Sequence, residues 1–336
     1  MTVQERIAAD DLKVGDFIAR GAAEALPRAY GEALLAAAGR HPELVCLCAD
    51  LTLSTETDLF QERYPERFFH AGIAEANMMG MAAGMARSGH IAFAHTFSVF
   101  ATRRAYDQVA MQVAYPRTAV KIAGFLPGLT TLLGVSHQAI DDVALMRALP
   151  NMAIVEPATA EQIPAIVEAA CLRDGPVYLR MRRAARAHRP ELARAEFAFG
   201  KGRVLREGRD AVIFACGLMV ASALDAADAL AAQGVDVAVV DLASIKPLDT
   251  ELVRAMAARC RVVVTAENHS IVGGLGSAVA ECLAEEGGAA PLRRVGVRDV
   301  FAEGGSTPYL MKKYGLDAEA IAAAVRDGLA AGRGAA

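Results

Sequence analysis

The 336-residue sequence lacks an apolar run of about eighteen residues, the length that a membrane-spanning helix needs. Its N-terminal region, with Asp10, Asp11, Lys13 and Asp16, also lacks the basic start and apolar centre of a signal peptide. We therefore expect a cytoplasmic protein. A formal net charge of -4, with 22% charged residues, gives no electrostatic reason to expect nucleic acid or a membrane surface as a partner.

The usual signatures of metal, nucleotide and nucleophile sites are missing too. The seven histidines show no paired metal-binding spacing, and we find no P-loop, nucleophile elbow or internal repeat. The run Gly273-Gly274-Leu275-Gly276 does not match the glycine pattern of a dinucleotide site, so we expect it to pack a helix on a strand, with His269 structural or interfacial. We expect buried, reduced thiols at cysteines 46, 48, 171, 216, 260 and 282.

Short apolar runs alternate with helical segments along most of the chain. This alternation predicts an α/β fold in two domains, the first with a mostly parallel sheet covered on both faces and the second a smaller α/β unit. The expected strands are 44–48, 91–95, 120–124, 153–155, 177–179, 211–215, 235–240, 261–265 and 293–297. The expected divisions are a polar leader over 1–24, a first domain over 25–183, a linker over 184–210 and a smaller α/β domain over 211–336.

One carboxylate stands out because small and apolar residues surround it in the sequence. Glu75 follows a short aromatic strand that ends at Gly72, and it falls at the start of a helix expected over 76–87. Burying an ionised carboxylate is costly unless it is paired or keeps its proton. Glu75 is therefore either a favourable charge at a helix N-terminus or a chemically active group, and the residues alone leave both interpretations open.

Polar and aromatic residues follow two of the expected strands. Asp50 and Ser54 come directly after the first strand, where open α/β sheets bind ligands, although both could instead cap the next helix. Phe97 and Phe100 are spaced to share one face of a helix that we expect to begin with them. Such a pair more often indicates a core than a cofactor site.

Seven segments together resemble the C-terminal half of transketolase, that is, the pyrimidine-binding domain and the C-terminal domain of thiamine diphosphate enzymes. They occur in the family's order and cover most of the chain, from about residue 28 to 329. The resemblance implies a parallel-sheet pyrimidine-binding fold followed by a smaller α/β C-terminal domain. The segments are Arg28-Ala29-Tyr30-Gly31-Glu32, Ala49-Asp50-Leu51-Thr52, Gly72-Ile73-Ala74-Glu75-Ala76-Asn77-Met78, Thr96-Phe97-Ser98-Val99-Phe100, Ser136-His137-Gln138, Ala148-Leu149-Pro150-Asn151-Met152 and Gly273-Gly274-Leu275-Gly276.

The resemblance implies a catalytic and cofactor-binding role for Glu75. In this family the glutamate of the Ile-Ala-Glu motif hydrogen-bonds N1′ of the aminopyrimidine ring of thiamine diphosphate. Sharing a proton with N1′ helps the cofactor to lose its C2 proton, and C2 then acts as the nucleophile. Phe97 and Phe100 match aromatic residues that flank the pyrimidine, and Asp50 would lie near the cofactor at a subunit boundary.

The same resemblance implies a substrate site. Arg28, Ser54 and Arg183 match positions that hold the phosphate of a sugar phosphate in transketolase, and an arginine fork suits phosphate geometrically. Arg180 and Arg182 are the alternatives to Arg183 in this alignment. His137 would face the substrate hydroxyls and the reacting carbonyl, so it is both a catalytic and a substrate-binding candidate.

The loop before His137 departs from the family pattern. The family usually has an aspartate four residues before this histidine and a histidine twelve residues before it, where this sequence has Leu133 and Phe125. A leucine cannot accept the hydrogen bond of the acceptor's 2-hydroxyl, and an unpaired hydroxyl in a closed site costs about 1–3 kcal/mol. We therefore expect Phe125 and Leu133 to line a site for a less hydroxylated, more apolar acceptor.

One family motif is missing altogether. Transketolases anchor the diphosphate and Mg²⁺ through a Gly-Asp-Gly motif in an N-terminal domain, and no Gly-Asp-Gly occurs in this sequence. The resemblance thus implies a split enzyme, in which a separate N-terminal subunit supplies the diphosphate domain and the metal ligands in an α2β2 assembly. The alternatives are the beta subunit of a 2-oxoacid dehydrogenase or acyloin-type carboligase, or a non-catalytic assembly subunit.

Overall fold

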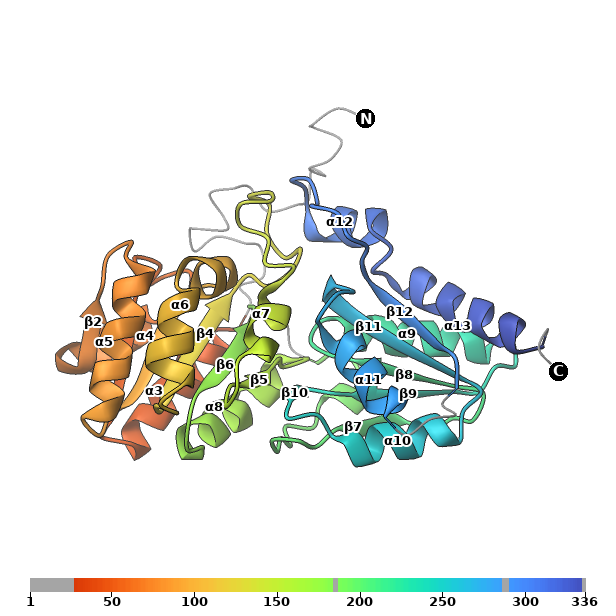
Figure 1. Cartoon of the computed structure of the whole chain (residues 1–336), viewed down its shortest axis with the longest axis horizontal. Coiled ribbons are helices and arrows are strands. Elements are labelled where there is room, and N and C mark those ends of the chain that lie inside the picture. Colours follow the sequence, from red (N-terminus) through yellow and green to blue (C-terminus); the bar gives the residue numbers. More distant parts are fainter. Residues whose placement is uncertain (1–26, 184–186, 286–289, 334–336) are drawn as a thin grey trace.

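Two α/β domains lie side by side in the computed structural model, which describes residues 27–183, 187–285 and 290–333 (Figure 1). The expected leader over 1–24 lies outside the described residues. Each domain has one sheet with helices on both faces, as the alternating pattern predicts for the first domain. Within the described residues, no helix combines the length and the apolar character needed to cross a membrane.

The first sheet has seven strands in the order β10-β5-β6-β4-β3-β1-β2. All neighbours are parallel except β10, which runs antiparallel to β5. Because the carboxyl ends of parallel strands meet at one edge, the segments that follow β1, β2, β3, β4 and β6 converge there. The strands are β1 (Leu44–Cys48), β2 (Phe68–His70), β3 (Ile91–Phe97), β4 (Val120–Phe125), β5 (Ala153–Val155), β6 (Val177–Met181) and β10 (Ser244–Lys246).

Helices cover both faces of this sheet, so every residue of its central strands β4 and β6 is buried. On β1, Leu44 and Cys46 pack in the cluster that includes α3 and α8, whereas Val45 and Leu47 pack in the cluster that includes α5. The helices are α3 (Ala29–Arg40), α4 (Asp58–Arg63), α5 (Glu75–Arg87), α6 (Tyr106–Gln108), α7 (Asp142–Ala148) and α8 (Ile163–Leu172), with the 3₁₀ turns η1 (Pro65–Arg67) and η4 (Ala160–Gln162).

The aromatic segment differs from its expected form. Phe97 is the last residue of β3, and the helical segment after it is mostly π-helix, as η2 (Phe100–Arg104) and η3 (Val109–Ala114). The prediction that Phe97 and Phe100 share a helix face is therefore wrong. Their ring centroids still lie 6.0 Å apart, because the chain turns from strand to helix between them.

The second domain has a five-stranded sheet in the order β12-β11-β8-β9-β7. Helices α9 and α13 pack on one face of it, and α10 and α11 on the other. Its strands are β7 (Arg203–Arg206), β8 (Ala211–Ala215), β9 (Val237–Asp241), β11 (Val262–Ser270) and β12 (Leu292–Val297). Its helices are α9 (Met219–Ala231), α10 (Thr250–Ala258), α11 (Leu275–Ala284), α12 (Thr307–Lys313) and α13 (Ala318–Arg333), and the 3₁₀ turn η5 (Pro190–Leu192) precedes β7.

Two strands depart from the expected division. β7 lies inside the range expected to be linker, but it pairs antiparallel with β9 at the edge of the second sheet. β10 follows β9 in the chain, yet it pairs with β5 of the first sheet. Lys246 of β10 also donates to the carbonyls of Arg147 and Leu149, at 2.8 and 2.6 Å. The second domain is thus anchored in the first.

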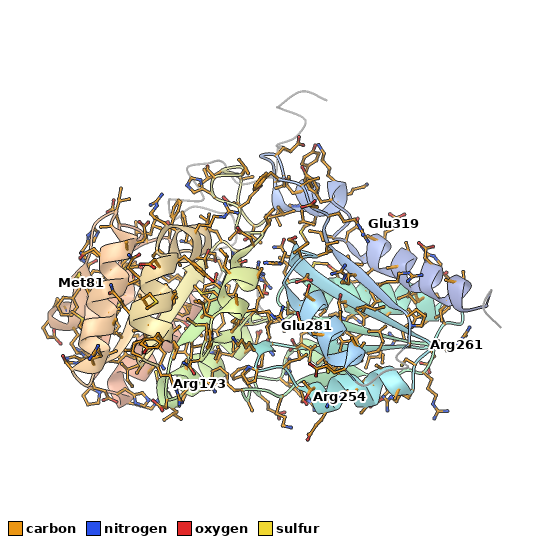
Figure 2. The ribbon with its side chains drawn as sticks, in the orientation of Figure 1. Met81, Arg173, Arg254, Arg261, Glu281 and Glu319 are labelled. Atoms are coloured by element: carbon orange, nitrogen blue, oxygen red, sulfur yellow. The ribbon has the colours of Figure 1, made fainter. Side chains whose placement is uncertain are left out.

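Side chains and a loop make further contacts between the two domains. Arg147 of α7 pairs at 2.5 Å with Glu281 of α11, which is labelled in Figure 2. The loop between β4 and α7 lies beside α12 in Figure 1, and Asn268 holds it by accepting from Leu129 N at 3.0 Å and donating to Pro127 O at 3.3 Å. The second domain therefore helps to fix the loop that carries Leu133.

The glycine run and the cysteines take the structural roles expected of them. Gly274 is the N-cap of α11, where Glu267 accepts from Leu275 N at 2.6 Å and Gly276 N at 2.9 Å. A Cβ at Gly274 would collide with this carboxylate, whose pKa burial raises to about 7 despite the two backbone donors. The helix end thus binds a carboxylate of its own chain. All six cysteines are buried and unbonded to one another.

Candidate active site at the carboxyl edge of the first sheet

Glu75 is the first residue of α5 and only 1% exposed. Its carboxylate does not sit among apolar groups alone, as its sequence neighbours suggested. Arg104 donates from Nη1 to both Oε1 and Oε2 at 2.9 Å, and the Thr96 hydroxyl lies 3.5 Å from Oε1. The burial cost of this carboxylate is therefore offset by an ion pair, which the sequence analysis did not foresee.

Three rings gather next to this carboxylate. Phe97 is buried at the end of β3, and Phe100 begins the π-helix that carries Arg104. The His137 ring packs edge-on against both, with centroids 5.2 Å from Phe100 and 6.1 Å from Phe97. Burial and the positive charge of Arg104 lower the pKa of His137, so its imidazole is neutral at neutral pH. The structure thus brings Glu75, Phe97, Phe100 and His137 together.

Asp50 lies at the same edge of the sheet, just after β1. Its backbone is left-handed, with φ 55°, and its carboxylate pairs with His70 Nε2 at 3.2 Å. His70 in turn accepts from Gly72 N through Nδ1 at 3.2 Å. Both side chains are about half exposed, so Asp50 faces solvent.

The three residues matched to phosphate binding are grouped around another carboxylate. Arg183 donates to Leu53 O at 2.9 Å, beside Ser54, while Arg28 pairs with Asp58. Buried Glu56, which accepts from Gly31 N at 3.0 Å, lies close enough to both arginines for their charges to act on it. Burial raises the pKa of Glu56, and the Gly31 hydrogen bond, Arg183 and Arg28 oppose that rise. Glu56 and Asp58 also belong to this group of residues, although the sequence analysis did not predict them.

The other two arginines that the alignment offered, Arg180 and Arg182, point elsewhere. Arg180 is fully buried and pairs with Asp142 and Glu156, at 2.8 and 2.9 Å. Arg182 donates to Ala158 O at 2.6 Å. Among the three alternatives, Arg183 is the one whose guanidinium contacts the Leu53–Ser54 segment.

Phe125 and Leu133 lie in different surroundings. Phe125 is fully buried at the end of β4 and packs edge-on against Tyr30, with ring centroids 5.2 Å apart. It is a core residue, so the prediction that it contacts substrate is not supported. Leu133 is 37% exposed in the loop before His137.

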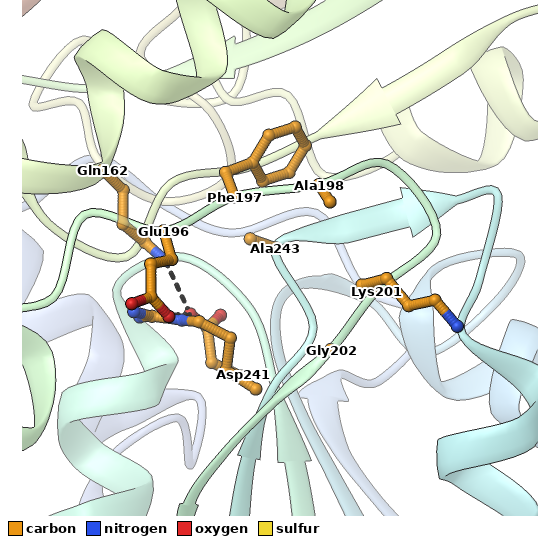
Figure 3. A pocket seen from close by; sticks show the side chains of 9 residues that line it. Gln162, Glu196, Phe197, Ala198, Lys201, Gly202, Asp241 and Ala243 are labelled. Carbon is orange, nitrogen blue, oxygen red and sulfur yellow. Dashed lines mark hydrogen bonds and ion pairs between the residues drawn. The ribbon is translucent and has the colours of Figure 1, made fainter.

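A cavity of about 260 Å³ lies between the linker and the second sheet (Figure 3). Asp241 at its base accepts from Gln162 Nε2 at 2.8 Å and from Arg203 Nη2 at 2.9 Å. None of the predicted site residues lines this cavity. The chemistry-bearing groups instead gather at the open edge of the first sheet.

The gathered groups define what this edge can do. A buried carboxylate can accept hydrogen bonds from a ligand ring and share its proton. The adjoining aromatic rings offer flat apolar contact, and a neutral imidazole can donate to or accept from a hydroxyl. The arrangement suits a flat heterocycle with N–H groups and a polyhydroxylated substrate beside it.

Comparison with known proteins agrees with this arrangement. Residues 24–187 match the model of the transketolase pyrimidine binding domain, and residues 200–321 match that of the transketolase C-terminal domain. The chain is 45% identical to the 6-deoxy-6-sulfo-D-fructose transketolase subunit SqwH of a Clostridium species, over 89% of this chain and 92% of that protein. It is 42% identical to a putative transketolase C-terminal section of Methanocaldococcus jannaschii, over 90% of this chain and 95% of that protein.

A solved structure is similar throughout the same region. It is described as a split gene transketolase, inactive beta4 tetramer, and it is 49% identical with a TM-score of 0.82. The match covers 90% of this chain and 97% of that one. The chain therefore belongs to the transketolase family, of which it contains the pyrimidine-binding and C-terminal domains.

Proposed function

We propose that this chain is the C-terminal subunit of a two-chain, thiamine diphosphate-dependent transketolase-like enzyme. The enzyme transfers a two-carbon ketol unit from a ketose to an aldehyde acceptor. The observation that carries this function is the buried Glu75 carboxylate, which lies at the carboxyl edge of the sheet beside Phe97, Phe100 and His137.

The residues at this edge fit the cofactor that the family implies. The Glu75 carboxylate already accepts from a flat, delocalised donor, the guanidinium of Arg104. An aminopyrimidine ring is flat as well, its ring nitrogen can share a proton with the Glu75 carboxyl, and its faces find apolar contact in Phe97 and Phe100. When bound, thiamine diphosphate supplies the carbon nucleophile that takes up and releases the ketol unit.

The chain's own side chains then divide the remaining work. Glu75 holds the proton shared with the ring nitrogen, and its burial keeps water from competing for that hydrogen bond. Neutral His137 contacts the substrate hydroxyls and the reacting carbonyl. Arg28, Ser54 and Arg183 hold the anionic end of the substrate, with Asp50 near the cofactor.

A second chain completes the site. The sequence contains no Gly-Asp-Gly, so the diphosphate and Mg²⁺ need ligands from a transketolase N-terminal subunit. Ile73, two residues before Glu75, is 74% exposed, and Leu53 and Val135 are also exposed. Large apolar side chains around a catalytic edge fit a surface that another chain covers. The similar beta4 tetramer, described as inactive, and the relative named as a subunit support an α2β2 enzyme.

The donor substrate carries a terminal anion. The 45% identical relative is named for a 6-deoxy-6-sulfo ketose, which ends in a sulfonate. A sulfonate offers three oxygens to donors, as a phosphate does, so the Arg28 and Arg183 guanidinium groups can bind either. Glu56 and Asp58 neutralise part of this positive charge, which favours the less charged sulfonate over the phosphate dianion.

Reconstitution tests this function. The chain is mixed with the transketolase N-terminal chain of the same organism, thiamine diphosphate and Mg²⁺, and ketol transfer is followed from fructose 6-phosphate and from 6-deoxy-6-sulfofructose. We expect turnover in the mixture and none from either chain alone. A mixture that binds the cofactor but transfers no ketol unit from either donor would contradict the proposed reaction.

Leu133 sets the acceptor preference in the same assay. Replacing Leu133 by Asp restores an acceptor for the substrate's 2-hydroxyl, so we expect kcat/KM for ribose 5-phosphate to rise about tenfold, as for one recovered hydrogen bond. Leu133→Asn is the matched control, because its amide also accepts a hydrogen bond but adds no charge. A kcat/KM unchanged in both variants would show that this loop does not determine acceptor choice.

A further inference from the structure

Arg104 contacts two of the side chains that the cofactor ring needs. Its Nη1 donates to both oxygens of Glu75 at 2.9 Å. Its guanidinium carbon also lies 4.2 Å from the centre of the Phe100 ring, in a cation–π contact. Arg104 is also close to His137: burial lowers the pKa of this imidazole most, and the positive charge of Arg104 lowers it further.

The cofactor's pyrimidine ring is expected to make the same two contacts, with Glu75 and with Phe100. Both groups are flat and delocalised, and both would use Glu75 and the face of Phe100: the guanidinium donates its N–H groups to the carboxylate, and the pyrimidine nitrogen shares a proton with it. On the basis of the function proposed above, we infer that Arg104 occupies the pyrimidine position in the cofactor-free chain and leaves Glu75 when thiamine diphosphate binds. Arg104 is thus an internal competitor for the cofactor site.

The burial of Glu75 explains why the cofactor-free chain needs a positively charged partner for this carboxylate. The Glu75 side chain is only 1% exposed, and an unpaired carboxylate at that depth would destabilise the cofactor-free chain. The Arg104 side chain is 46% exposed, so its guanidinium can move into water without crossing the core. The π-helix that places Arg104 over Phe100 begins at Phe100 itself, which fixes the two residues relative to each other.

The neighbouring arginine provides a matched control. Arg103 lies on the same π-helix but donates to Asp141, at 2.9 Å from Nε, and makes no contact with Glu75 among the described hydrogen bonds and ion pairs. Arg103→Ala therefore removes a guanidinium from the same helix and leaves the Glu75 pair in place. A change in cofactor affinity that both variants share would come from an altered helix and not from lost competition with the cofactor.

The test measures cofactor binding in the reconstituted two-chain complex with Mg²⁺. Calorimetry gives the Kd of thiamine diphosphate for wild type, Arg104→Ala and Arg103→Ala. We expect Arg104→Ala to bind about tenfold more tightly than wild type, since one charge-assisted hydrogen bond no longer has to be broken. We expect Arg103→Ala to stay within about twofold of wild type. An Arg104→Ala affinity that is unchanged or weaker would overturn the inference.

A second measurement follows the Glu75–Arg104 contact itself, and Arg104→Gln, which keeps most of the side chain, replaces Arg104→Ala in it if that variant folds poorly. In a double-mutant cycle of Glu75→Gln and Arg104→Ala, thermal unfolding of the cofactor-free chain should show favourable coupling between the two residues. The same cycle applied to the cofactor-saturated complex should show that coupling lost. Coupling that persists with cofactor bound would mean that Arg104 stays on Glu75. Absence of cofactor binding by wild type would instead contradict the proposed function itself.

Discussion

Glu75→Gln is expected to lower ketol transfer in the reconstituted enzyme at least 100-fold. The amide can still hydrogen-bond a ring nitrogen, but it cannot share a proton with it, and a positioned proton-transfer group typically contributes about 10²- to 10⁴-fold. Loss of C2 hydrogen exchange, followed by NMR after acid quenching, should accompany the loss of turnover. The cofactor should still bind, because Phe97 and Phe100 remain in place.

Glu66→Gln is the matched control for this experiment. Glu66 lies in the short turn before β2, and its exposed side chain pairs only loosely with Arg67, at 3.7 Å. The same change of charge at that position should leave exchange and turnover within about twofold of wild type, as for most surface substitutions. Exchange retained in Glu75→Gln would show that another group handles the proton.

Arg180→Met is expected to have the largest effect on stability. Arg180 is fully buried where the two domains meet, and it donates to Asp142 at 2.8 Å, Glu156 at 2.9 Å and the Asn268 carbonyl at 2.9 Å. Methionine fills much of the volume but leaves two buried carboxylates without their cation. Breaking such a cluster costs about 3–5 kcal/mol, which should appear in the free energy of unfolding from denaturant titration.

The pH dependence identifies the cause of that loss. Burial would raise the pKa of Asp142, but the charge and hydrogen bonds of Arg180 outweigh it and hold this pKa below its ordinary value. A lowered carboxyl pKa adds stability at neutral pH, and that stability disappears as the pH falls through the folded pKa. The deficit of Arg180→Met should therefore shrink below about pH 4. Arg182→Met, which removes a hydrogen bond to the Ala158 carbonyl but leaves the ion pairs of Arg180 with Asp142 and Glu156 in place, is the control. A deficit below about 1 kcal/mol, or one independent of pH, would contradict this role.

Strands and helices with strong local patterns could be predicted from the sequence. The bounds of β1, β5 and β8 match the expected strands, because each is a short apolar run between turn residues. The seven family segments predicted the grouping of Glu75, Phe97, Phe100 and His137, since parallel strands bring their carboxyl ends to one edge. Their catalytic and binding roles remain predictions.

Features that depend on partners distant in sequence could not be predicted. β10 joins the first sheet, although its local sequence does not distinguish the two sheets. The family alignment left Arg180, Arg182 and Arg183 as alternatives, and the structure buries Arg180 of β6 against acids from other elements. Arg104 was missed for the same reason, although an Arg103-Arg104 pair inside an otherwise apolar helix was a signal that one of them has a buried partner.

The central claim is that this chain supplies half of a cofactor site, and calorimetry tests it most directly. Thiamine diphosphate is titrated, in the presence of Mg²⁺, into this chain alone, into the N-terminal transketolase chain alone and into their equimolar mixture. We expect binding in the mixture, with one cofactor for each pair of chains, and none in this chain alone. Binding of similar affinity to this chain alone, or no binding in the mixture, would contradict the claim.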